Sequence, residues 1–359
     1  MTISEITKSS NNSLRIKELS SLRGLFMITI FLHHLGLYEG GAYMAVSFFF
    51  VLSGYSLTLG YYNKIINSQF SYKSFIIRRF ARLYPVHWLC FFVILPLYLT
   101  AFLNGAGLYK LIPNLLLMQS LFPVMDVYFS YNAVSWYLSD ILIMAIFFPI
   151  IIKLFNMVSQ SKRVTLISLF ITVYFVAVKN LPLDLYHALL YINPFFRMID
   201  FVIGIILGLL FVQWKNNKEI QKRNKSKRIQ YIVLGLSSFI TMILLSLIYD
   251  TENPLFIAAF YWLPVSLLIF SVSAINSLGG GFILTSKCLV YLGEISLSFF
   301  MFHQIIIRYA SVMFSKLFHT SNLTHPILII LIFIVVVFVS HLSNKYFERP
   351  IFKWITTRG

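Results

Sequence analysis

Long apolar stretches recur along this chain from residue 22 to residue 344, and they restrict its fold more than any other feature. A helix needs ~20 apolar residues to cross ~30 Å of hydrocarbon, where only helices and closed barrels satisfy the backbone. Only 11% of the residues are charged, against roughly a quarter in a soluble domain, which excludes a soluble core. The sequence therefore predicts an all-α polytopic membrane protein with about ten transmembrane helices, over residues 22–38, 43–60, 85–103, 134–152, 164–179, 195–214, 229–249, 255–275, 288–312 and 326–344.

The distribution of basic residues predicts the orientation of these helices. With the N-terminus inside, the segments that alternate to the cytoplasm contain all but five of the 29 Lys and Arg residues. Cytoplasmic loops carry such an excess, so we expect both termini in the cytoplasm. The net charge of +17 then reflects topology, and we expect no nucleic acid as a partner. The exceptions are Lys110, Lys179, Arg197, Arg308 and Lys316.

The segments outside the spans complete the expected organisation. Residues 1–21 are polar and lack the apolar core of a secretory signal. We therefore expect a cytoplasmic tail followed by one transmembrane domain over residues 22–359, with no appended soluble domain. The short apolar segment 105–133 is interpreted as an interfacial or re-entrant piece on the outer side. The basic run over residues 215–228 is either a loop that fixes topology or a contact for anionic lipids. The spacing of the two cysteines suits no metal site.

The first predicted helix carries Arg23 and His34 on one face. They are eleven residues apart, which is three turns plus ~20° and ~16 Å along a helix axis. Ionisable groups inside a membrane need a partner or a function. A histidine exchanges protons near neutral pH, so His34 facing a cavity would suit a general base for a hydroxyl. The alternative is a buried histidine with a structural hydrogen bond, which is the interpretation we give to His33, ~100° away.

Three arginines, Arg78, Arg79 and Arg82, come just before Pro85. Their spacings of three and four residues place them on one side of a helix. Guanidinium groups bind phosphates in bidentate fashion, so the cluster would suit the phosphates of coenzyme A. An ordinary basic anchor at the inner boundary is the alternative.

Polar and small residues also interrupt the later spans. Arg197 and Asp200 are three residues apart and can neutralise each other. Gly204 and Gly208 form a small-residue stripe, which lets membrane helices approach closely. The other isolated polar residues are Asp140, Glu294 and His303.

The order of these motifs resembles the acyltransferase 3 family of multi-pass membrane acyltransferases, over roughly residues 17–355. No single stretch is decisive, but their order on a background of about ten spans is specific. The matching stretches are LRGLFMITIFLHH at 22–34, FFFVLSGYSLT at 48–58, RRFARLYP at 78–85, FFRMIDFVIG at 195–204, ISLSFFMFH at 295–303 and FERP at 347–350.

The resemblance implies an O-acyltransferase, most simply an O-acetyltransferase, in the bacterial cytoplasmic (inner) membrane. Its donor would be cytoplasmic acyl-CoA, usually acetyl-CoA, with no bound cofactor. Its acceptor would be a hydroxyl of a cell-surface polysaccharide or a lipid-linked sugar. By motif position the catalytic residues would be His34, Arg23 and Ser53, and the donor-binding residues Arg79 and Arg82, helped by Arg78. The sequence leaves open whether the acyl group passes directly or through an enzyme-bound intermediate.

Two positions depart from the family. Many members carry Asp where this chain has Ser47, and many carry Glu where it has Ile141, one residue after Asp140. If the acids of the family tune the histidine, that tuning must come from elsewhere here. A transporter or flippase of a glycan or lipid is the alternative function, because intramembrane His and Arg suit that class as well.

Overall fold

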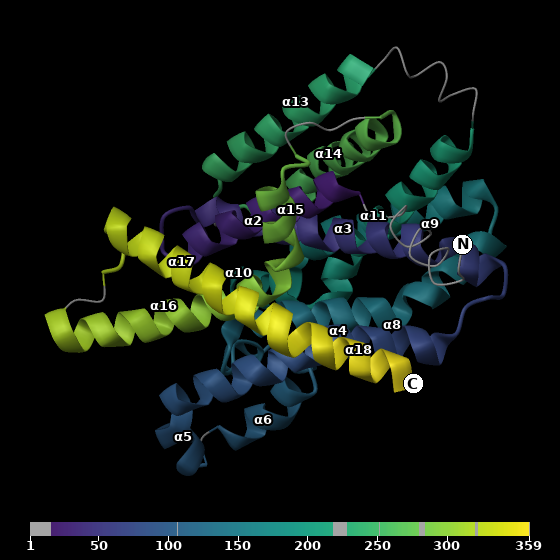
Figure 1. Ribbon diagram of the computed structural model, residues 1–359. Coiled ribbons are helices and arrows are strands. Elements are labelled where there is room, and N and C mark those ends of the chain that lie inside the picture. The colour runs from purple at the N-terminus through teal and green to yellow at the C-terminus, as the bar shows by residue number, and fades with distance from the viewer. Residues whose placement is uncertain are drawn as a thin grey trace, which may run out of the picture.

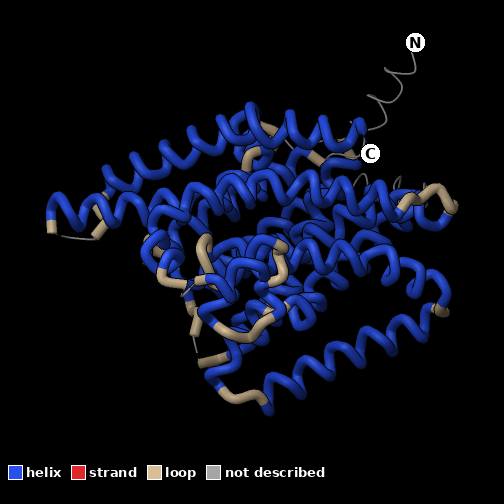
Figure 2. Tube along the Cα trace, turned by 90° about the horizontal axis from the view of Figure 1, so that it is seen from below, coloured by secondary structure: helices blue, strands red, loops and turns tan. Residues whose placement is uncertain are grey.

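The computed structural model describes residues 16–105, 107–217, 228–250, 252–279, 284–319 and 322–358. This part of the chain is built from helices and contains no strand, as Figure 1 and Figure 2 show, and the predicted all-α class is confirmed. Most of the predicted tail, residues 1–15, lies outside the described residues. So does most of the basic run, residues 218–227.

The longer helices form one bundle (Figure 1). They are α2 (Lys17–His34), α3 (Glu39–Ile66), α4 (Tyr72–Ile94), α8 (Trp136–Met157), α9 (Gln160–Asn180), α11 (Pro194–Asn216), α13 (Arg228–Leu247), α14 (Ala259–Ser277), α16 (Ser296–Phe318) and α17 (Pro326–Leu342). The shorter elements are η1 (Leu95–Tyr98), α5 (Leu99–Leu103), α6 (Leu108–Leu115), η2 (Gln119–Leu121), α7 (Met125–Tyr128), η3 (Ala133–Ser135), α10 (Leu183–Leu185), η4 (Tyr186–Ile192), η5 (Pro254–Ile257), α15 (Lys287–Glu294), η6 (Ser343–Glu348) and α18 (Arg349–Arg358).

The described residues include eight helices that are long and apolar enough to cross a membrane. The chain is therefore a multi-pass membrane protein. The remaining two predicted spans, 22–38 and 164–179, correspond to α2 and α9, which are helical but are not among these eight. The total of about ten spans stays a prediction.

Helix α2 begins at Lys17 rather than at residue 22 and ends at His34 rather than at residue 38. It packs against α3, α14, α15 and α16, so its polar first turn is satisfied by protein rather than by solvent. Glu18 is buried and accepts hydrogen bonds from Asn276 Nδ2 at 2.8 and 3.0 Å. A helix enclosed in this way needs no apolar surface for lipid. Apolar composition alone therefore placed the start of this helix too late.

The predicted span 288–312 is wrong in its first part, because the structure has two helices there, α15 and α16, which meet at Ile295. Helix α15 packs along α2. The approach is so close that a Cβ added to Gly293 would lie 1.7 Å from the carbonyl oxygen of Ser20. The apolar residues of α15 thus cover α2 instead of crossing the membrane with α16.

The last predicted span, 326–344, continues beyond its expected end. Helix α17 passes through η6, a π-helical segment, into α18. Glu348 in η6 is buried and accepts hydrogen bonds from Ser298 at 2.6 Å and from Ser343 at 2.8 Å. This buried carboxylate joins the C-terminal helix to α16, and α18 also packs on α4.

Helices α3 and α11 meet at two glycines. A Cβ added to Gly54 would lie 2.0 Å from the carbonyl oxygen of Phe201, and one added to Gly204 would lie 2.0 Å from that of Val51. The backbones are therefore in direct contact, as small residues allow between membrane helices. Gly204 thus has the structural role that its spacing predicted. Gly208 faces the side chain of Thr58.

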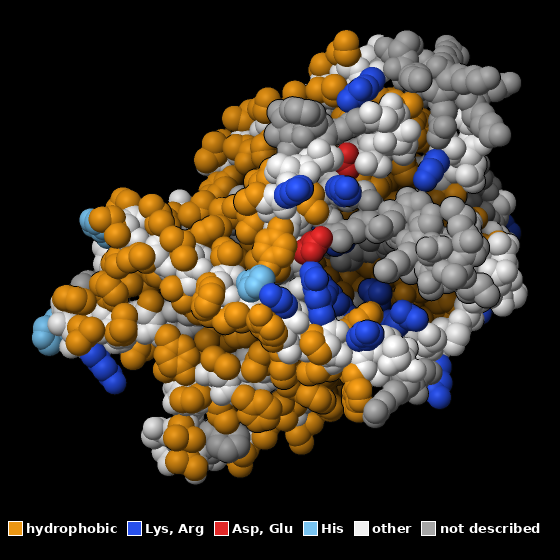
Figure 3. Space-filling view, viewed as in Figure 1, with side chains coloured by type: hydrophobic (Ala, Val, Ile, Leu, Met, Phe, Trp, Pro, Cys, Tyr) orange, Lys and Arg blue, Asp and Glu red, His pale blue; other side chains and the backbone are white. Residues whose placement is uncertain are grey.

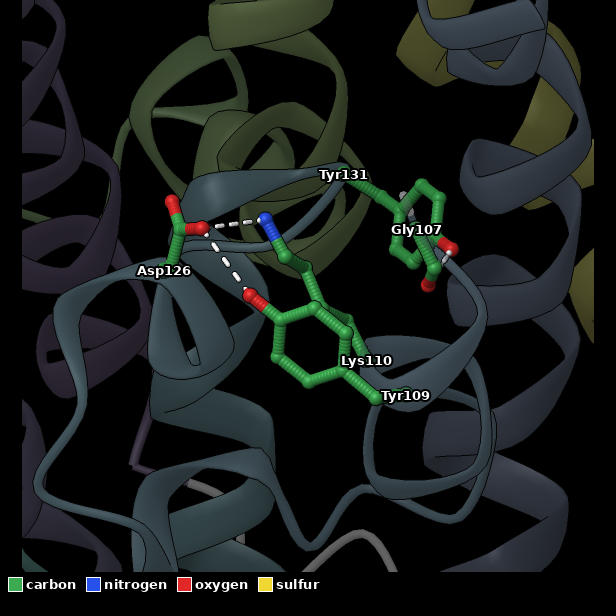
Figure 4. A network of polar contacts seen from close by, with 5 residues as sticks. All are labelled: Gly107, Tyr109, Lys110, Asp126 and Tyr131. Atoms are coloured by element: carbon green, nitrogen blue, oxygen red, sulfur yellow. Dashed lines mark hydrogen bonds and ion pairs between the residues drawn. The ribbon is translucent and has the colours of Figure 1, made fainter. Parts of the chain in front are cut away.

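The segment between α4 and α8 forms a cap of short helices, η1 to η3, at one end of the bundle (Figure 1). Asp126 of α7 accepts hydrogen bonds from Lys110 at 2.6 Å and from Tyr109 at 3.0 Å, and Tyr131 donates to the carbonyl of Gly107 at 2.9 Å (Figure 4). The hydrogen bond from Lys110 holds the pKa of Asp126 below its usual range. We call this end of the bundle the cap end.

The opposite end carries the start of α4 and the end of α18, and we call it the basic end (Figure 1). Lys and Arg side chains gather in the right half of the face in Figure 3, whereas the left half is mostly hydrophobic. This distribution agrees with the asymmetry read from the sequence.

Candidate active site

A cavity of about 390 Å³ lies next to His34 near the cap end. Helices α2, α3, α8 and α16 line it together with the cap and η4. We call it the His34 cavity; its lining includes His33, His34, Tyr43, Phe129, Trp136, His187, Tyr191, Phe300, Gln304 and Arg308. None of its lining residues is Asp or Glu. The predicted cavity at this histidine is therefore present.

His34 is held by a second histidine. His303 of α16 places its Nε2 3.3 Å from Nδ1 of His34, and the carbonyl of Ile30 lies 2.9 Å from the same Nδ1. Nδ1 of His303 in turn lies 2.7 Å from the carbonyl of Phe300. Carbonyl oxygens only accept hydrogen bonds, so both rings carry a proton on Nδ1. Nε2 of His303 is then an acceptor for the Nδ1 proton of His34.

This arrangement fixes the tautomer of His34. With the proton on Nδ1, its Nε2 keeps a free electron pair and has no hydrogen-bond partner within the described residues. An imidazole nitrogen in this state can remove a proton from a hydroxyl. His303 therefore orients His34 in the way that a second group orients the base of a catalytic triad. Sequence spacing noted His303 as an isolated polar residue but gave no sign of this contact.

His33 also lines the cavity, which its helical position did not predict. Its Nδ1 lies 2.8 Å from the carbonyl of Glu39, the first residue of α3. The rings of His33 and His34 are 5.1 Å apart. The predicted hydrogen-bonding role of His33 is thus present, although the residue does not point away from the site.

Arg23 faces a different cavity, of about 260 Å³, which we call the Arg23 cavity. Its guanidinium donates to Ser56 of α3 at 3.4 Å. The lining residues are Ile16, Leu19, Ser20, Arg23, Tyr55, Ser56, Leu59 and Gly60. Arg23 and His34 thus lie along one helix, α2, but they line two different cavities rather than one.

Three aromatic side chains pack together beside the His34 cavity. Tyr137 of α8 packs its ring 4.9 Å from that of Phe50 and 5.2 Å from that of Phe300, which lines the His34 cavity. Tyr137 also lies against Ser53, one helical turn before Ser56. We call Phe50, Tyr137 and Phe300 the aromatic wall. Ser53 lines neither cavity and lies beside Tyr137 of this wall.

The three predicted donor-binding arginines lie on α4 near the basic end. Arg78 is exposed, whereas Arg79 and Arg82 are half-buried. The Arg79 guanidinium lies 5.4 Å from the centre of the Phe75 ring. None of the three lines either cavity. The structure therefore does not bring them to His34, and their donor role stays a prediction.

Arg197 is fully buried and organises the centre of the bundle. It donates to Ser47 at 3.1 Å and to the carbonyl of Ile257 at 3.0 Å, and its Nη2 lies 3.4 Å from Asp200. The predicted neutralisation between Arg197 and Asp200 is confirmed. Position 47, where the family often has Asp, is therefore a partner of Arg197 and not of His34.

Asp140 is fully buried in α8, and neither of its carboxylate oxygens has a hydrogen-bond partner among the described residues. It does not contact His34. In the described part of the chain, no group of three or more His, Cys, Asp or Glu residues could hold a metal ion.

Comparison with known proteins gives consistent matches. The Acyltransferase domain family matches residues 16–342. Acyltransferase MdmB of Streptomyces mycarofaciens is 28% identical over 286 residues, which are 74% of this chain and 68% of that protein. A protein of Staphylococcus aureus strain COL with the provisional name O-acetyltransferase is 24% identical over 93% of this chain. The chain spans only 57% of the length of that relative. No solved structure matches the chain significantly.

Proposed function

The chain belongs to the acyltransferase 3 family, and from this premise we propose that it moves an acyl group, most simply acetyl, from acyl-CoA to a sugar hydroxyl. The observation that carries the proposal is the orientation of His34 by His303 at the wall of a cavity. A base with a free nitrogen, in the wall of a chamber large enough for a sugar, suits hydroxyl activation. Five of the lining residues are aromatic, namely Tyr43, Phe129, Trp136, Tyr191 and Phe300, and such rings can stack on sugar rings.

The proposed reaction balances as a direct transfer. Nε2 of His34 removes the proton from the acceptor hydroxyl, whose oxygen attacks the thioester carbonyl. The tetrahedral intermediate collapses, the carbon–sulfur bond breaks, and the proton on His34 passes to the departing CoA thiolate. The products are an O-acyl ester and free CoA. His303 acts as a positioning residue, because its contact is with His34 at 3.3 Å.

We place the donor on the basic end and the acceptor on the cap end. An arginine cluster on α4 supports the first assignment, and the aromatic lining near the cap supports the second. The acyl group must then pass the aromatic wall to reach His34. Tyr137, which contacts both Ser53 and Phe300, would line this route. If the basic end of the protein faces the cytoplasm, the donor would approach from the cytoplasm and the acceptor from outside the inner membrane.

Purified protein in lipid nanodiscs tests the proposal. We expect it to release CoA thiol from acetyl-CoA only when a glycan or lipid-linked sugar is present, with one acetyl ester formed per thiol. Mass spectrometry of surface glycans from cells with and without the gene would identify the acceptor. A protein that moves a sugar across vesicle membranes without consuming acetyl-CoA would instead be a transporter.

Replacing Arg79 and Arg82 together by alanine is expected to raise the KM for acetyl-CoA about 10-fold or more, with little change in the KM of the acceptor. A charge-assisted hydrogen bond to phosphate contributes about 1.5–3 kcal/mol, and 1.4 kcal/mol corresponds to tenfold in affinity. Steady-state kinetics with each substrate varied in turn measures both constants.

Lys73→Gln is the matched control for this double variant, because it removes an exposed positive charge from the same helix. Arg79→Lys with Arg82→Lys separates charge from geometry, since lysine keeps the charge but not the bidentate donor pair. An unchanged KM for acetyl-CoA in the alanine variant would exclude these arginines as phosphate ligands.

A further inference from the structure

One guanidinium lies on the wall of the His34 cavity without an acidic partner. Arg308 of α16 donates through Nη1 to the hydroxyl of Tyr98 and, at 3.4 Å, to the carbonyl of Tyr131. Both partners are neutral. No carboxylate lies within ion-pair distance of Arg308 among the described residues. A charge without a counter-charge is costly within a helix that can span the membrane, as α16 can. Arg308 therefore indicates a ligand that supplies the counter-charge.

The position of Arg308 places it on the acceptor side of the reaction centre. Phe300, Gln304 and Arg308 are each four residues apart on α16 and line the same cavity. Phe300 belongs to the aromatic wall, so Arg308 lies ~12 Å nearer to the cap end along the helix axis. A molecule that reaches from His34 toward the cap would pass Gln304 and meet Arg308 at its far end.

The guanidinium of Arg308 still has N–H donors that can bind a ligand. Both hydrogen bonds of Arg308 within the described residues use Nη1, whereas an arginine side chain has five N–H donors. The donors on Nη2 and Nε therefore remain for a ligand. The ring of Tyr98 lies 5.9 Å from the guanidinium carbon and holds the group in place. A guanidinium fixed in this way suits the paired oxygens of a phosphate or carboxylate.

We infer that the acceptor is an anion whose phosphate or carboxylate binds Arg308 while its hydroxyl lies at His34. This inference rests on the proposed function and adds the chemical class of the acceptor. Two sources carry such a group: the pyrophosphate that joins a sugar to a polyprenyl lipid, and the carboxylate of an acidic sugar. The absence of Asp and Glu from the described lining of the cavity favours either one over a cationic acceptor.

Binding to purified protein in nanodiscs, without acetyl-CoA, tests the inference apart from the chemistry. The probes are N-acetylglucosamine on a short prenyl pyrophosphate, the same sugar on a neutral prenyl ether, and a disaccharide that contains a uronic acid. We expect Arg308→Gln to weaken binding of one anionic probe by roughly 30-fold or more and to leave the neutral probe unchanged. Arg308→Lys should restore part of the loss.

Lys316→Gln is the matched control, because Lys316 is an exposed cation on the same helix, outside the cavity. The anionic probe that loses affinity identifies the source, pyrophosphate or carboxylate. Equal losses for charged and neutral probes, or no loss at all, would overturn the inference. Failure of the proposed function looks different: the probes bind with the expected discrimination, but the protein transfers no acetyl group to any of them.

Discussion

Replacing His34 by alanine is expected to lower the turnover of acyl transfer by about 10²–10⁴-fold, the usual contribution of a general base. The reason is geometric: His34 offers an unprotonated Nε2 at the cavity, and its Nδ1 proton is held by Ile30 and His303. The KM values of both substrates should change little, because the imidazole acts mainly in the transition state. Release of CoA thiol from labelled acetyl-CoA, in the presence of acceptor, measures the effect.

The fold should survive this change. His34 lies at the end of α2 and beside a cavity, so its loss leaves the core of the bundle intact. Gel filtration and thermal unfolding in detergent check this. His341→Ala is the matched control, since that histidine lies at the end of α17 and its partner is Tyr291. If the His34→Ala protein kept a tenth or more of the normal turnover, another group would have to be the base.

Replacing Gly204 by valine is expected to prevent stable accumulation of the protein. Even a Cβ at this position would lie 2.0 Å from the carbonyl oxygen of Val51, which belongs to the backbone of α3 and cannot rotate away. Helices α3 and α11 would have to separate, and Arg197 on α11 would lose its alignment with Ser47 on α3. Overpacking alone costs about 1–3 kcal/mol, and loss of the hydrogen bond between the Arg197 guanidinium and Ser47 adds about 1.5–3 kcal/mol.

Membrane-fraction yield and the midpoint of thermal unfolding measure this effect. Gly235→Ala is the matched control, because its Cβ would lie 3.4 Å from the Cβ of Ser271, an ordinary contact. That change is expected to be neutral or slightly stabilising, since alanine favours a helix over glycine by about 1 kcal/mol. Normal yield and unfolding of the Gly204→Val protein would show that α3 and α11 do not touch as described.

The helical fold could be predicted from the sequence because apolar length determines it. The misplaced boundaries have one cause: a helix covered by other helices no longer needs an apolar exterior. Helix α2 thus begins in a polar stretch whose Glu18 is paired with Asn276. Helix α15 looks like the start of a span, yet it covers α2. A hydropathy profile shows where a helix has an apolar surface, but it cannot tell whether lipid or another part of the protein covers that surface.

The candidate site could be predicted only in part, for a related reason. His34 was found because a histidine inside a span is rare. Its contact with His303 joins residues 269 positions apart, and helical spacing relates only near neighbours. Arg308 was counted as an exception to the charge rule, with no sign that it lines the same cavity. The role of Ser47 also became visible only through Arg197, which lies 150 positions away.

The proposed function would bring a thioester and a sugar together inside a membrane, where a continuous water-filled path would leak ions. The His34 cavity and the Arg23 cavity have no lining residue in common. Phe50, Tyr137 and Phe300 are buried and packed ring against ring. Packing of this kind leaves no room for a hydrated ion. A protein whose two chambers stay apart can therefore sit in an energised membrane without dissipating its proton gradient.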